Sequence, residues 1–136
     1  MEDKTRILFL RISYWVGAIV DGFVAIAWLF PDFWASFSNF LQHANSVELS
    51  FSMWQGAALM AGWTVLLLWA DRKPVERKGI LLITIFPVLA GMVLANILSV
   101  SSGLRTIETV APVLLLQCLL AVLFMGSYLI QKKSSA

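Results

Sequence analysis

The sequence predicts an all-α integral membrane protein, a four-transmembrane-helix bundle with a short interfacial amphipathic helix between spans one and two. Hydrophobic residues make up 60% of the 136 residues and charged residues only 13%, against soluble averages of about 45–50% and 25%. Four apolar stretches are each long enough to cross a hydrocarbon core of about 30 Å. The length suits one domain, so we expect a single four-helix transmembrane domain over residues 1–136.

The first predicted span covers residues 7–30 and carries an acid, Asp21, near its middle. A carboxylate at that depth costs roughly 2.5–3.5 kcal/mol even on the mild insertion scale, so it normally faces the bundle interior and marks a functional site. The apolar run is longer than that of a signal peptide and has no clean cleavage site at its end. We therefore expect this segment to be a retained span.

Between spans one and two, residues 32–42 are predicted to form an amphipathic helix that lies in the membrane interface. Pro31 ends the first span, and Phe33, Phe37 and Phe40 then recur at helical spacing. Such a helix would cover the outer end of the bundle. A lid over a lateral opening is the alternative role.

The other three spans are expected at about residues 50–70, 79–99 and 108–130. A proline inside the third, Pro87, removes one backbone hydrogen bond and should kink that helix. Small residues four apart, such as those at positions 58 and 62 and at 91 and 95, allow helix backbones to approach closely. They favour ordinary helix packing, and they also lead us to expect a homo-oligomer or a membrane partner protein.

The basic residues predict the orientation of the chain. Nine of the ten lysines and arginines fall on the side that holds both termini and the connection between spans two and three. Only Arg105 falls on the other side. This bias predicts that both termini are cytoplasmic, and it suits the cell membrane of a prokaryote, that is, its inner membrane.

Polar residues within the spans define the candidate site. Counted from the outer ends of their spans, Asp21 and Gln117 are each nine residues deep, about 13 Å, and so are expected at one level. Gln55 and Asn96 are expected nearer the outer mouth. We expect Asp21 to be held largely neutral and to donate a hydrogen bond to Gln117 or to a ligand. The alternative is an interhelical clamp that only fixes helix order.

Helical spacing places these polar residues on two inward-facing stripes. One stripe of the first span, at steps of three and four residues, consists of Tyr14, Gly17/Ala18, Asp21, Ala25 and Trp28. Gln117 and Tyr128 lie on a comparable stripe of the fourth. Two aromatic-rimmed stripes of this kind could enclose a pocket that opens toward the outer leaflet.

No catalytic or metal-binding motif is visible, and no cofactor or nucleic-acid partner is indicated. One cysteine, Cys118, excludes an internal disulfide, and one histidine, His43, excludes bis-histidine haem ligation within the chain. The sequence favours a non-enzymatic protein that holds a lipophilic ligand or a partner helix by apolar contacts, with Asp21 and Gln117 as polar anchors. Two alternatives stay open: a proton-coupled small-molecule transporter that uses Asp21, and an intramembrane enzyme that modifies lipids.

Overall fold

The computed structural model describes residues 2–30 and 47–132, and this part of the chain is helical apart from short connections. The long helices are α1 (Glu2–Leu29), α3 (Val47–Asp71) and α6 (Ile107–Lys132). The third helical stretch consists of α4 (Gly79–Ile83), η1 (Thr84–Leu89) and α5 (Ala90–Ser101). Four stretches are long and apolar enough to cross a membrane: Lys4–Leu29, Ser50–Asp71, Gly79–Ser101 and Ile107–Gln131. The interfacial helix predicted at residues 32–42 lies outside the described residues.

The third stretch is interrupted at Pro87, where a kink was predicted. Proline has no N–H to donate, and its ring clashes with the carbonyl four residues earlier. It also disfavours helical dihedral angles in the preceding residue, and Phe86 indeed has φ −93° and ψ 126°. The backbone makes a wider π-type turn over Thr84–Leu89 before the α-helix resumes in α5. The predicted kink is confirmed.

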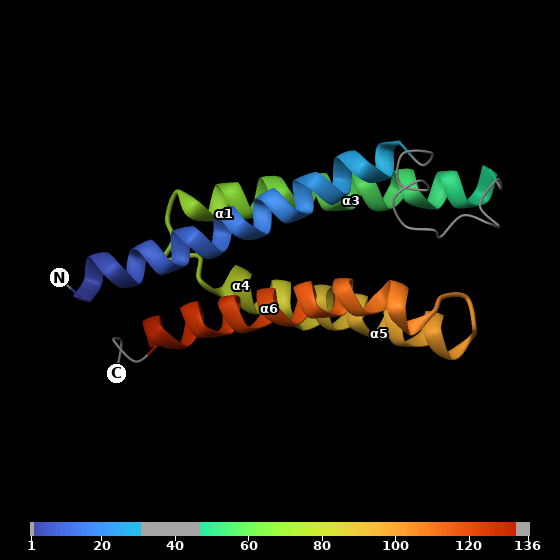
Figure 1. The fold of residues 1–136 in the computed structure, drawn as a ribbon. Coiled ribbons are helices and arrows are strands. Elements are labelled where there is room, and N and C mark those ends of the chain that lie inside the picture. Colours follow the sequence, from blue (N-terminus) through green and yellow to red (C-terminus); the bar gives the residue numbers. More distant parts are fainter. Residues whose placement is uncertain (1, 31–46, 133–136) are drawn as a thin grey trace.

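The helices form two antiparallel hairpins packed side by side (Figure 1). One hairpin is α1 with α3, and the other is α6 with the α4–η1–α5 stretch. The start of α1, the end of α6 and the connection from α3 to α4 lie together at one end of the bundle, which we call the terminal end. The turn between α5 and α6 lies at the opposite end, the turn end.

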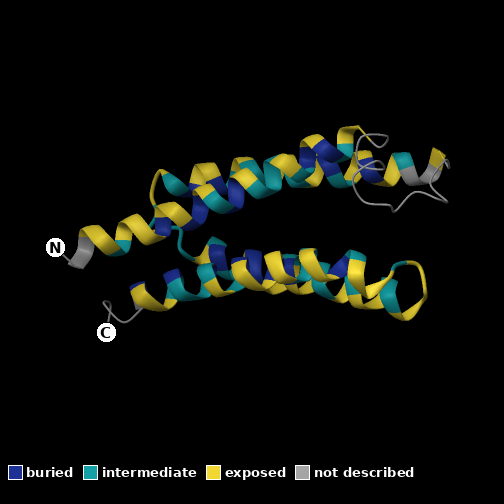
Figure 2. Cartoon of the chain, in the orientation of Figure 1, coloured by how far each residue is buried: buried dark blue, intermediate teal, exposed yellow. Residues whose placement is uncertain are grey.

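The hydrophobic core joins the two hairpins in the half of the bundle nearer the terminal end. Its buried members come from every helical stretch of the bundle and are Leu10, Tyr14, Ala18, Leu67, Ala70, Leu81, Ile85, Leu89, Leu120 and Phe124. The outward faces are largely exposed (Figure 2) and carry many large apolar side chains. A surface of this kind is typical of a protein whose solvent is lipid.

Direct contacts between α1 and α6 fix how these helices align. Ser13 and Ser127 share a buried hydrogen bond of 2.7 Å. One turn farther along α1, a Cβ placed on Gly17 would lie 2.9 Å from Phe124 and 3.0 Å from Leu67 of α3. Gly17 is therefore a point where α1 lies close to both of its neighbours.

Small residues on the outer faces are left uncovered within the chain. Ala58 and Gly62 on α3 are exposed, as are Gly91 and Ala95 on α5. A Cβ placed on Gly62 or on Gly91 would meet no other atom within 4 Å. These two pairs therefore do not serve packing inside the bundle.

Candidate functional site

The predicted inward-facing stripes agree with the observed burial. On α1, Tyr14 is fully buried, and Asp21 and Trp28 are partly buried. On α6, Gln117 is 3% exposed and Tyr128 is partly buried. The two stripes follow the faces along which α1 and α6 pack against their neighbours, so Asp21 and Gln117 both point into the bundle rather than away from it.

The alignment of α1 and α6 gives the relative depth of the two polar residues. Asp21 lies four residues beyond Gly17, about 6 Å toward the turn end. Gln117 lies seven residues beyond Phe124, the contact of Gly17, or about 10 Å in the same direction. By this count Gln117 is about 4 Å nearer the turn end than Asp21, which is less than one helical turn. Counting residues from the expected ends of the spans had predicted equal depth.

Asp21 makes no hydrogen bond or ion pair with the residues that the structure describes. Thr64 of α3 lies beside the next residue of α1, since a Cβ placed on Gly22 would be 3.8 Å from the Thr64 hydroxyl. That hydroxyl instead donates to the Met60 carbonyl of its own helix, at 2.9 Å. The alternative in which Asp21 clamps α1 to Gln117 thus has no supporting hydrogen bond.

A chain of polar contacts connects the turn end to Gln117. Arg105, which lies in the turn between α5 and α6, donates from Nη1 to Asn96 Oδ1 at 3.4 Å. Asn96 in turn donates from Nδ2 to Gln117 Oε1, also at 3.4 Å. Partial burial lowers the pKa of the Arg105 guanidinium, but arginine stays charged in proteins, so the group remains a donor only.

The other end of the Gln117 amide is unsatisfied. Its Nε2 is buried and has no hydrogen-bond partner within residues 2–30 and 47–132. A buried donor without a partner costs about 1–3 kcal/mol. Two groups therefore lack partners among the described residues: the Gln117 Nε2, which is a donor, and the carboxyl group of Asp21.

The other predicted site residues do not join this pair. Gln55 is exposed on α3. The ring of Trp28 lies against Gly56, where an added Cβ would overlap it. Tyr14 donates to the Pro74 carbonyl at 3.2 Å, close to the terminal end. The structure therefore connects Asn96 with Gln117, and it separates Tyr14 and Gln55 from them.

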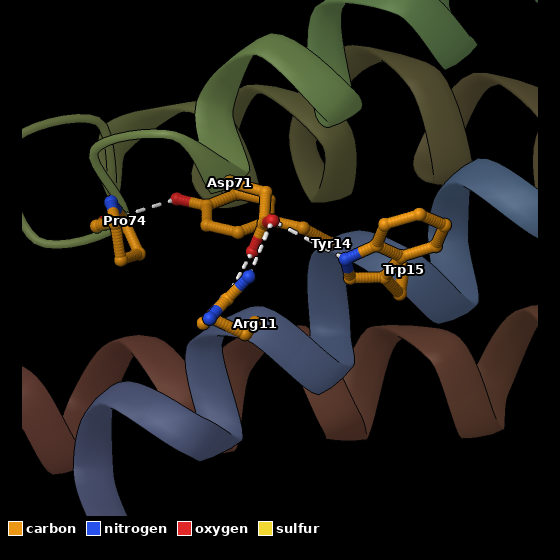
Figure 3. A network of polar contacts seen from close by, with 5 residues as sticks. All are labelled: Arg11, Tyr14, Trp15, Asp71 and Pro74. Carbon is orange, nitrogen blue, oxygen red and sulfur yellow. Dashed lines mark hydrogen bonds and ion pairs between the residues drawn. The ribbon is translucent and has the colours of Figure 1, made fainter. Parts of the chain in front are cut away.

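A second polar network, at the terminal end, was missed by the sequence reasoning (Figure 3). Asp71 accepts hydrogen bonds from Arg11 Nε at 2.9 Å, Arg11 Nη2 at 3.2 Å and Trp15 Nε1 at 3.2 Å. Tyr14 reaches the neighbouring Pro74 carbonyl. The signal was present, since Arg11 and Asp71 both lie at the inner edges of their predicted spans. This network fastens the start of α1 to the end of α3.

We expect Asp71→Ala to lower the melting temperature of the purified protein. The side chain of Asp71 is 11% exposed and accepts from two donor residues, and charge-assisted hydrogen bonds of this kind are stronger than neutral ones. Arg72→Ala, at the neighbouring exposed position, is the matched control. Thermal unfolding in detergent, followed by circular dichroism, measures both. Equal melting temperatures for the two variants would contradict this role.

No family model matches the chain, and no curated protein or solved structure matches it. Any function therefore has to be argued from the residues themselves. Within the part of the chain that the structure describes, no group of three or more His, Cys, Asp or Glu side chains could hold a metal ion. The arrangement offers groups that could recognise a ligand: a carboxyl group on α1 and an amide donor on α6, both without partners among the described residues.

Proposed function

We propose that this chain is a non-enzymatic multi-pass membrane protein that holds a lipophilic ligand between its two hairpins, with Asp21 and Gln117 as polar anchors. The observation that carries the proposal is that two groups lack hydrogen-bond partners among the described residues: the carboxyl group of the partly buried Asp21 and the Nε2 of the buried Gln117. Buried polar groups are nearly always hydrogen-bonded. A ligand with a polar group and an apolar body would satisfy both residues, and pockets between bundle helices are typically lined in this way.

Three observations support membrane insertion with cytoplasmic termini. Four helical stretches have the length and hydropathy of spans. Their outward faces are rich in exposed large apolar side chains. Of the nine basic residues that the structure describes, eight lie in elements at the terminal end, and Arg105 lies in the turn at the opposite end. We propose that the terminal end faces the cytoplasm of a prokaryotic cell and that the turn end faces outward.

Cysteine labelling tests this orientation. In a Cys118→Ala background, we expect Ser102→Cys, in the exposed turn between α5 and α6, to react with a membrane-impermeant maleimide in intact cells. Glu76→Cys, in the exposed connection between α3 and α4, should react only after the membrane is opened. The reverse pattern would invert the proposed topology, and labelling of both sites in intact cells would contradict membrane insertion.

The packing favours binding over proton-coupled transport. A carrier needs a route from Asp21 to each side of the membrane in turn. Toward the terminal end, the space between the hairpins is filled by fully buried side chains, including Tyr14, Leu67, Leu81 and Phe124. Asp21 and the Gln117 Nε2, which lack partners among the described residues, lie on the turn-end side of this core. The arrangement therefore suits a site entered from the outer half of the bilayer.

Native mass spectrometry of the gently extracted protein tests the proposal. We expect the wild type to retain a small molecule of defined mass, and we expect Asp21→Ala and Gln117→Ala to lose it, because each removes one anchor. Gln55→Ala removes an amide from an exposed position on α3 and should retain the molecule like the wild type.

Two results would contradict the proposal. One is a chain without any small molecule in all four proteins. The other is a partner protein bound equally by all four proteins. That result would mean that Asp21 serves only in helix packing. A pH-driven flux through reconstituted wild type that is absent from Asp21→Ala would favour transport instead.

A further inference from the structure

We propose that the polar group recognised by Asp21 and Gln117 is the neutral hydroxyl of a lipid alcohol, a molecule with a single headgroup hydroxyl and long apolar tails. This inference rests on the proposed function and names the class of its ligand. Two observations support it: the direction of the hydrogen bonds that lead to Gln117, and the carboxyl group of Asp21 on α1.

The orientation of the Gln117 amide is fixed by the chain of contacts from the turn end. Arginine has donors only, so Arg105 must face an acceptor, the Oδ1 of Asn96. The other end of the Asn96 amide, Nδ2, is then the donor that faces Gln117 and binds its Oε1. This leaves the Gln117 Nε2 as the buried, unpaired end. The site therefore presents an N–H donor, not a carbonyl, to whatever fills it.

The opposing group on α1 has the complementary character. An ionised Asp21 is an acceptor only, and a protonated one has both a donor and an acceptor. A ligand that pairs with both residues must accept from Gln117, and it must donate to Asp21 if the carboxyl group is ionised or accept from it if the group is protonated. The oxygen of a hydroxyl can do either. An ester or ether oxygen can only accept, so it cannot pair with an ionised Asp21. A phosphate or carboxylate would bring a second negative charge beside an ionised Asp21 in a medium of low dielectric constant.

The closeness of α1 and α6 favours a lipid over a partner helix. At Gly17 an added Cβ would overlap Phe124 of α6, and Asp21 lies only about 6 Å farther along the helix. Even at a steep crossing angle of about 50°, two helix axes separate by only about 5 Å over that rise. A helix inserted between them would need about 8–10 Å to each neighbour. A hydrocarbon chain with a small headgroup is thin enough to enter.

Binding of three lipids with identical tails tests the inference. The probes are dioleoylglycerol, with one free hydroxyl, dioleoyl-acetylglycerol, in which that hydroxyl is blocked, and dioleoyl phosphatidic acid, in which it carries a phosphate. Delipidated protein is titrated with each probe, and the bound fraction is measured by native mass spectrometry. We expect the alcohol to bind at least about tenfold more tightly than its acetate, which corresponds to one or two hydrogen bonds.

Variants locate the preference for the hydroxyl. Asp21→Ala should bind the alcohol and the acetate equally, because only Asp21 requires a ligand that donates. Gln117→Ala should bind both lipids more weakly and still prefer the alcohol, because the acceptor on α1 is retained. Cys118→Ala changes the exposed neighbour of Gln117 on α6 and should keep the tenfold preference.

The remaining outcomes would overturn the inference. Equal binding of alcohol and acetate by the wild type, or tightest binding of the phosphatidic acid, would exclude a hydroxyl-specific site. If no probe binds while the wild type still retains a different small molecule that depends on Asp21 and Gln117, the lipid-alcohol assignment fails and the proposed function stands. If the wild type holds no molecule that depends on these residues, both fail.

Discussion

Gly17→Leu is expected to destabilise the protein by about 3 kcal/mol, near the upper end of the cost of overpacking a core. A Cβ alone at this position would lie 2.9 Å from Phe124 and 3.0 Å from Leu67. Both of those side chains are essentially inaccessible to solvent, at 1% and 0% exposure, so neither can swing away without disturbing the core. The added side chain would force α1 away from α3 and α6 together.

Gly62→Leu is the matched control for this substitution. It makes the same chemical change within a helix and gains the same helix propensity, about 0.8–1.0 kcal/mol over glycine. A Cβ on Gly62 meets no other atom within 4 Å, so we expect no loss of stability there. Unfolding in a mixed-micelle titration gives the free energy for both variants. If Gly17→Leu were as stable as Gly62→Leu, the close contact between the hairpins would be refuted.

Asp21→Leu is expected to have the opposite effect and to raise the stability of the ligand-free protein by about 1–3 kcal/mol. The carboxylate is partly buried and has no described partner, so its desolvation is not repaid by a hydrogen bond. Leucine is larger than aspartate, but it has no polar group to desolvate. Natural proteins commonly sacrifice stability at functional sites in this way. The free energy of unfolding after exhaustive delipidation measures the change.

The interhelical-clamp alternative makes the opposite prediction for the same variant. If Asp21 fixed helix order through a hydrogen bond, its removal would cost stability, by about 0.6 kcal/mol on average in comparable membrane proteins. Cys118→Ala, at an exposed position of α6, gives the background effect of a neutral substitution. A stability of Asp21→Leu below that background would support the clamp.

The helical architecture was predictable because it depends on features that sequence displays directly. Span length follows from hydropathy, and the break near Pro87 follows from the chemistry of proline. The inward stripes of α1 and α6 follow from helical spacing alone. For this reason the burial of Tyr14 and Gln117 could be predicted before the packing of the helices was known.

The connections within the candidate site were not predictable in the same way. The relative depth of Asp21 and Gln117 depends on how α1 slides along α6, which is set by the contact of Gly17 with Phe124. Counting residues from the expected ends of spans cannot detect an offset of about 4 Å. The partnership of Asn96 with Gln117 likewise depends on the packing of α5 against α6.

The thermal response to added lipid tests the central claim most directly. Delipidated wild type, Asp21→Leu and Cys118→Ala are melted with and without a lipid extract of the native membrane. A ligand that binds only the folded state raises stability by about 2.7 kcal/mol at a hundred times its Kd. We predict that the extract raises the melting temperature of the wild type and of Cys118→Ala and leaves Asp21→Leu unchanged. An equal rise in all three proteins, or no rise in any, would contradict a ligand anchored by Asp21.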